Sequence, residues 1–173
     1  MNIVIAACQI LIALAFVSIP MVRARYGPRA QAAAEAELTR QGIRPQVLGE
    51  NKLRFDAGGH ETAVPVTVAA IMAAVAALNL LDSSWAAPGT WLFQSLVLLG
   101  NLAILYSNIT AVKSVEAAFA KRGDAELARV DVRAFLTAAE NAFPAWVFPW
   151  LQNLRHVIVF GASIAALLLT ANG

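Results

Sequence analysis

The sequence contains few of the residue types that carry chemistry in small proteins. It has one cysteine, Cys8, and two histidines, so no internal disulfide can form. No CxxC, HExxH or Walker-type glycine loop is present. These absences exclude a disulfide-stabilised scaffold and the zinc and phosphate sites that have recognisable spacings. The redox state of the compartment stays open.

Charge is also scarce, because Asp, Glu, Lys and Arg make up only 14% of the 173 residues, against about 25% in a typical soluble domain. Hydrophobic residues reach 59%. A soluble domain of this length could not bury so much apolar surface in one core. The net charge is only +2, with acids beside the basic residues, which argues against nucleic acid as a partner. We therefore predict an all-α integral membrane protein.

Four apolar stretches set the predicted architecture: residues 3–22, 63–82, 91–112 and 150–170. About 20 residues of helix cross the hydrocarbon core of a bilayer. The first stretch lacks a positively charged start and is long for a signal peptide, so we interpret it as an uncleaved anchor. Residues 1–173 then form one membrane domain with two long loops, 23–62 and 113–146.

The distribution of basic residues predicts the orientation. Seven Lys and Arg lie between Arg23 and Arg54, five lie between Lys113 and Arg133, and the last, Arg155, lies in the fourth span. By the positive-inside rule both long loops are cytosolic, and both termini are outside the cell. We expect the plasma (inner) membrane as the location.

Local patterns predict structure in the two long loops. Residues 28–41 are rich in helix formers, so a helical extension is expected there, ending at Gly42. Residues 46–48 and 53–55 flank a turn-forming segment and suggest a small β-hairpin. The third span is expected to continue as helix through Lys121. Asp124 is then a candidate N-cap for a further helix that runs to about Asn141.

The third span carries a regular polar pattern. Gln94, Asn101 and Asn108 recur every seven residues, so the three amides lie along one side of the helix. An amide that faces lipid lacks hydrogen-bond partners, so this side should face protein. The favoured interpretation is a seam that fixes helix packing, and the alternative is a polar lining for a ligand or an ion.

The fourth span contains the ionisable pair Arg155 and His156 inside an apolar stretch. Charged groups inside a span are costly and often functional, although Arg155 is near enough to the headgroups to reach them. A second group of candidates near the inner leaflet combines this pair with neighbouring amides: Asn108, Gln152, Asn153, Arg155 and His156. Such a cluster would form either a structural lock, which we favour, or a pocket for a lipid headgroup.

No cofactor, metal site or catalytic residue is predicted. A membrane b-type haem generally needs two histidines on facing helices, and His60 lies in the first loop. Every acidic residue lies outside the spans except Asp82 at a boundary, which argues against a proton relay.

These observations favour a non-enzymatic accessory or assembly subunit of a larger plasma-membrane complex. Its partners would be the lipid bilayer and other membrane subunits or further copies of the chain. The alternatives are a small homo-oligomeric transporter or channel-like module, whose path Gln94, Asn101 and Asn108 would line, and a lipid-binding or lipid-modifying enzyme around Arg155 and His156.

Overall fold

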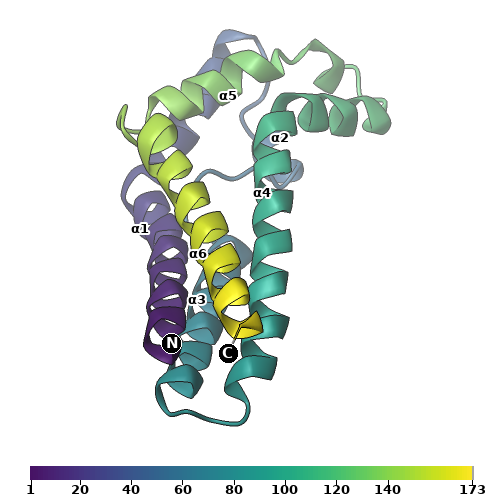
Figure 1. The fold of residues 1–173 in the computed structure, drawn as a ribbon. Helices are drawn as coiled ribbons and strands as arrows, with labels where there is room; N and C mark the ends of the chain where they lie inside the picture. The colour runs from purple at the N-terminus through teal and green to yellow at the C-terminus, as the bar shows by residue number, and fades with distance from the viewer. Residues whose placement is uncertain (173) are drawn as a thin grey trace.

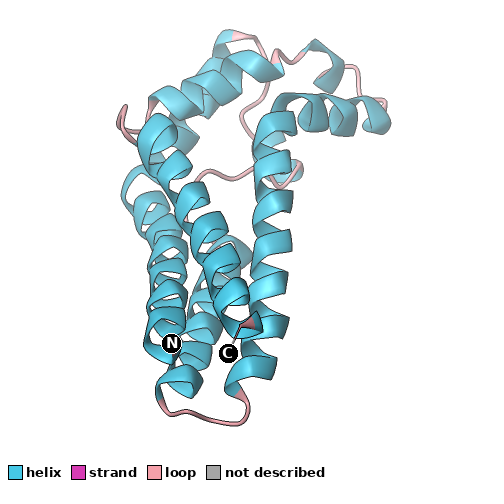
Figure 2. Cartoon of the chain, viewed as in Figure 1, coloured by secondary structure: helices cyan, strands magenta, loops and turns pink. Residues whose placement is uncertain are grey.

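The computed structural model describes residues 1–172, and in this range every regular element is a helix (Figure 2). The elements follow in the order α1 (Asn2–Arg40), α2 (Val47–Glu50), α3 (His60–Leu80), α4 (Ala86–Arg122), η1 (Leu127–Arg129), α5 (Val132–Asn141), η2 (Val147–Gln152) and α6 (Asn153–Ala171). The all-α class is confirmed. Four of the helices, α1, α3, α4 and the α6 segment, are long and apolar enough to cross a membrane.

The four long helices run side by side as a bundle, and α5 lies across one end of it (Figure 1). We call this end, which also holds α2, the capped end. Both termini and the short α3–α4 connection lie at the opposite end (Figure 1). Asn2 Nδ2 donates a hydrogen bond to Asp82 Oδ1 at 2.5 Å and so ties the N-terminus to that connection.

Two of the long helices extend beyond their apolar stretches. α1 continues without a break through Pro20 and Pro28, so the helix expected at residues 28–41 is its final part. α4 likewise continues through Arg122. Gly42 and Gly123 follow the two helix ends with φ angles of 72° and 64°. Glycine adopts this left-handed conformation without a steric penalty, which explains where both helices stop.

The suggested β-hairpin does not form, because the segment folds as α2 and turns. Val47 and Leu48 are adjacent and both fully buried, and they pack with Leu38, Phe119 and Phe135 in the core of the capped end. Successive residues of a strand point to opposite faces. One helical turn allows both side chains to enter the same core.

The helix expected to begin at Asp124 begins later. The carboxylate of Asp124 accepts a hydrogen bond from Glu126 N–H within a turn, and Val130 is extended. Asp131 is the N-cap of α5, because its Oδ1 accepts from Ala134 N–H at 2.9 Å. Both aspartates suit a cap in sequence, and the extended residue between them decides which one starts the helix.

Candidate functional site

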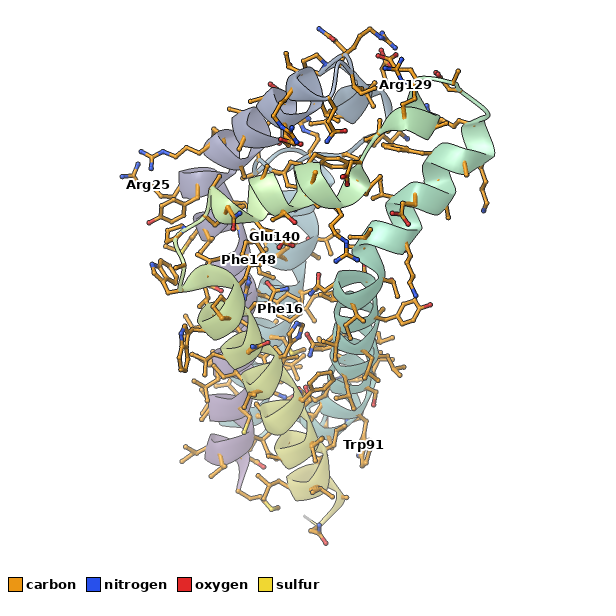
Figure 3. The ribbon with its side chains drawn as sticks, turned by 90° about the horizontal axis from the view of Figure 1, so that it is seen from above. Phe16, Arg25, Trp91, Arg129, Glu140 and Phe148 are labelled. Carbon is orange, nitrogen blue, oxygen red and sulfur yellow. The ribbon has the colours of Figure 1, made fainter. Side chains whose placement is uncertain are left out.

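A cavity of about 550 Å³ lies inside the bundle near the capped end. Its wall includes residues of α1, α3, α4, α5, η2 and α6, together with Phe55 from the α2–α3 segment. Figure 3 labels three residues of this wall, with Glu140 and Phe148 near α5 and Phe16 further toward the middle of the bundle, whereas Trp91 lies toward the opposite end. The volume is within the range of small-molecule sites.

The wall has a polar part and a larger apolar part. The polar part consists of Arg23, Asn101, Asn108, Glu140, Gln152, Arg155 and His156. The apolar part is rich in aromatic side chains, including Phe16, Phe55, Phe143 and Phe148. The cavity therefore offers both charge and hydrocarbon-like surface to one molecule.

The polar wall contains a pair of side chains whose hydrogen bonds are incomplete. His156 Nδ1 and Asn101 Oδ1 are 3.1 Å apart. Asn101 is 4% exposed, and its Nδ2 has no partner; the buried Nε2 of His156 has none either. If the ring donates from Nδ1, the amide N–H groups of Asn101 remain unpaired. If the amide is turned round, the Nε2–H of His156 remains unpaired. Both assignments therefore leave a residue of the cavity wall with an N–H donor that has no acceptor.

Arg155 and Arg23 bring positive charge to the wall from two different helices. Arg155 donates to Gln152 Oε1 at 2.8 Å, a neutral acceptor one turn earlier. Both arginine side chains line the same cavity. Arg23 also interacts with the carboxylate of Asp56 in the α2–α3 segment. The polar wall is thus a region where two cations converge.

Part of the cavity wall is exposed. Val64 of α3 is 57% exposed and Ile104 of α4 is 39% exposed, and both line the cavity. Asn108, also on α4, is exposed as well. The cavity is therefore open, and the exposed part of its wall includes residues of both α3 and α4.

Aromatic packing holds the other side of the site. The rings of Phe143 and Phe148 meet edge to face with centroids 5.3 Å apart. The ring of Tyr26 in α1 packs near two further rings, with centroid distances of 6.5 Å to Phe143 and 6.4 Å to Trp146. Edge-to-face pairs of this kind add to the stabilisation from burial. They fix α1 against the chain that leads into η2 and α6.

The segment 51–59 covers the cavity next to α1 and is held by a close contact at Gly27. A Cβ atom at Gly27 would lie 2.6 Å from Phe55 O and 2.7 Å from Asp56 Cα. Phe55 N–H also donates to Gln31 Oε1 at 3.2 Å. Glycine at this position therefore lets the segment approach α1 closely and place Phe55 in the wall.

The three amides predicted to form a row on the third span have different surroundings. Gln94 is fully buried, and its Nε2 donates to Ser163 Oγ of α6 at 2.9 Å. Asn101 of α4 also faces α6, where its partner is His156. Asn108 is exposed and, like Asn101, lines the cavity. The row of amides thus meets α6 at Gln94 and Asn101 and lines the cavity at Asn101 and Asn108.

Of the four candidate residues in the fourth span, three line the cavity and one does not. Gln152, Arg155 and His156 all line the cavity. Asn153 does not, because it is exposed and its Nδ2 donates to Pro149 O at 2.8 Å.

Two features of the bundle were not anticipated from the sequence. Arg23 was interpreted only as a flanking charge of the first span, although the wall includes it. The second feature is a buried polar network of Gln9, Asn79 and Thr90. Asn79 Nδ2 lies 3.2 Å from Gln9 Oε1 and 3.0 Å from Thr90 Oγ1. Gln9 Nε2 donates to Thr90 Oγ1 at 3.1 Å. The network joins α1, α3 and α4. The isolated Gln9 in an apolar span was the available signal.

Comparisons with protein families, with characterised proteins and with solved structures found no match. In the part of the chain that the structure describes, no group of three or more His, Cys, Asp or Glu side chains is placed to hold a metal ion. The chemistry of the site must therefore be argued from its own residues.

Proposed function

We propose that this chain is an integral membrane protein that binds an amphiphilic molecule from the bilayer in the cavity near its capped end. The four long apolar helices would cross the membrane, with both termini outside and the capped end in the cytosol. The cavity would then lie near the cytosolic leaflet, where headgroups meet hydrocarbon.

The observation that carries this proposal is the two-part lining of the cavity. Arginine and amide side chains form one part, and aromatic and aliphatic side chains form the other. A purely structural seam would leave no space between them. A water-filled path would not need the aromatic surface. An amphiphile satisfies both parts at once, and an opening between α3 and α4 would admit it from the membrane.

The test is retention of a lipid or lipid-like molecule by the purified chain. The protein would be extracted from its native membrane in mild detergent and washed extensively, and bound molecules would be identified by mass spectrometry. We expect about one amphiphile per chain. Ala111→Phe would fill the cavity, since Ala111 lines it, and should abolish retention.

Ala103→Phe is the matched control, because Ala103 is on the same helix, is exposed and does not line the cavity. It should retain the molecule. Equal retention by the two variants, both monodisperse in size-exclusion chromatography, would place the molecule on the outer surface and refute the proposal.

A second candidate function is that of an accessory or assembly subunit, and the exposed surface of α4 favours it. α4 is the least buried of the four long helices. Ser107 and Asn108 are exposed within its apolar stretch, where lipid offers no hydrogen-bond partner. A neighbouring subunit or another copy of this chain would supply one. Affinity purification with subunit stoichiometry tests this, and a monomeric particle would refute it.

The homo-oligomeric transporter has less support as a proposal. The cavity wall includes Asn101 and Asn108 but not Gln94, which is bonded to Ser163. Within one chain the amides therefore do not line a continuous path along α4.

A further inference from the structure

We infer that the cavity selects an amphiphile with a compact oxyanion headgroup, such as a phosphate monoester, held by Arg155 and Arg23 with help from the Asn101–His156 pair. This inference rests on the proposed amphiphile binding and adds the chemical class of the ligand.

The charge of the site favours an anion. Arg155 and Arg23 converge on one cavity from α6 and α1, and a guanidinium group stays protonated under all physiological conditions. In the described part of the chain, the hydrogen-bond partner of Arg155 is the neutral amide of Gln152. An oxyanion in the cavity would accept charge-assisted hydrogen bonds from the two guanidinium groups.

Among the described side chains, the carboxylates of Glu140 and Asp56 lie near this site and set limits on the ligand. Glu140 lines the cavity and is exposed, so it lies at the rim. Asp56 interacts with Arg23 from the α2–α3 segment. Both disfavour an anion that extends toward the capped end. A compact headgroup held by Arg155 and Arg23 would bring less negative charge near these carboxylates than a large anionic headgroup would.

The unpaired donor lies in the same wall. As described above, each assignment of the Asn101–His156 contact leaves one N–H group without an acceptor. A buried donor without a partner is costly, so a ligand atom that accepts there gains binding free energy. An oxyanion has several acceptor oxygens and can satisfy this donor and a guanidinium together.

The hydrocarbon chain has a route to the membrane. Val64 of α3 and Ile104 of α4 both line the cavity and are exposed, so an opening between these two helices would lead from the cavity to the membrane. A chain that leaves through this opening stays in hydrocarbon while the headgroup stays inside the protein. The ligand is therefore a membrane lipid of this class and not a free anion from the cytosol.

The experiment compares headgroups on identical chains. Delipidated protein would be titrated in native mass spectrometry with dioleoyl phosphatidic acid, dioleoyl phosphatidylcholine and dioleoylglycerol, and separately with inorganic phosphate. We expect phosphatidic acid to bind at least about tenfold more tightly than the other two lipids, which is the scale of a lost charge-assisted contact. Inorganic phosphate should not compete at similar concentrations.

Single substitutions test which side chains produce the preference for phosphatidic acid. Arg155→Gln and Arg23→Gln should each remove most of the preference for phosphatidic acid, while Arg155→Lys should keep part of it. Arg25→Gln is the matched control for Arg23→Gln, because Arg25 lies on the same helix, is exposed and projects away from the bundle (Figure 3). It should bind as the unchanged protein does. Glu140→Gln should bind phosphatidic acid as well or better.

The outcomes separate the two proposals. Equal affinity for all three lipids, still lost in Ala111→Phe, would refute the oxyanion inference and leave amphiphile binding intact. Inorganic phosphate that binds as tightly as phosphatidic acid would overturn the lipid as the source of the anion. If Ala111→Phe abolishes the binding of none of the three lipids, both proposals are refuted.

Discussion

At the scale of single residues, amide and hydroxyl side chains connect the apolar helices. Gln9, Asn79 and Thr90 join α1, α3 and α4, and Gln94 with Ser163 joins α4 to α6. In lipid, apolar surface does not drive helices together, so such bonds gain importance for orientation and specificity. Thr90 is central to the first group, since it accepts from both amides.

Thr90→Val should destabilise the bundle, because the isosteric change removes the acceptor for two buried amides. We expect a loss of about 1 kcal/mol, the upper range measured for such bonds in membranes, and a Tm lower by about 2 to 4 °C in detergent. Thr67→Val is the matched control, since Thr67 is exposed on α3. Equal melting temperatures for both variants would contradict a stabilising role for the network.

The sequence allowed part of this residue-scale account to be predicted. Spacing by seven places Gln94, Asn101 and Asn108 on one side of a helix regardless of its neighbours. It does not specify the partner of each amide, because that depends on the register between α4 and α6. Asn108 lies beyond the positions where α4 meets α6 through Ser163 and His156, and it lines the cavity, as Asn101 also does. A pattern within one helix contains no information about such a space.

At the scale of elements, the position of the segment 51–59 depends on Gly27. Gly27→Ala should displace this segment, because the added Cβ would meet backbone atoms at 2.6 and 2.7 Å. Trypsin should then cleave several-fold faster after the exposed Lys52 and Arg54. Gly161→Ala, where a Cβ meets nothing within 4 Å, should leave the cleavage rate unchanged. Equal rates in the two variants would contradict the close contact.

The loops of the capped end are joined by Arg44 and Glu126. The backbone N–H of Arg44 donates to Glu126 Oε1 at 3.0 Å, and its Nε donates to Oε2 at 2.8 Å. The two interactions lower the pKa of Glu126 below its ordinary value of 4.5. A carboxyl group with a lowered pKa stabilises the folded state above its unfolded pKa, and this contribution is lost as pH falls through the folded value.

Acidification should therefore loosen the contact between these two loops. Hydrogen exchange in α2 and η1, corrected for its intrinsic pH dependence, should rise as the pH falls below about 4. Glu126→Gln should show faster exchange already at neutral pH and a smaller further rise. Glu116→Gln, at an exposed position of α4, should behave as the unchanged protein does. An identical acid response in all three proteins would contradict the assignment.

The loops also show where sequence patterns stop being decisive. Residues 46–55 contain alternating apolar groups around a turn segment, which fits a hairpin. The pattern does not reveal that Leu38, Phe119 and Phe135 form a core that takes Val47 and Leu48 together. Similarly, the choice of Asp131 over Asp124 as the helix start depends on the extended backbone at Val130. Tertiary packing decides both.

At the scale of the whole molecule, composition predicts the architecture well. Long apolar stretches separated by charged loops define four long helices, and these are present at nearly the expected positions. The cavity was not predictable as a space, because its wall combines residues of six helical elements and two loop segments. Four of its polar residues were nevertheless candidates from their position near one end of the spans: Asn108, Gln152, Arg155 and His156.

The proposed orientation predicts which single cysteines are reachable from outside the cell. In a Cys8→Ala background, a cysteine at Ala87 should react with a membrane-impermeant maleimide, while cysteines at Glu50 and Ala125 should react only after the membrane is opened. All three positions are exposed in the fold, so accessibility depends on sidedness alone. The reverse pattern would invert the topology, and reaction at all three in sealed cells would refute membrane spanning.

Photo-crosslinking tests directly whether a membrane lipid occupies the cavity. A phosphatidic acid with a diazirine in its acyl chain would be added to membranes that contain the protein, illuminated and mapped by mass spectrometry. We predict crosslinks concentrated on cavity residues such as Phe16, Phe148 and Ile104, and their loss in Ala111→Phe but not in Ala103→Phe. Crosslinks spread evenly over outward residues such as Leu96 and Leu99, with none in the cavity, would contradict the account.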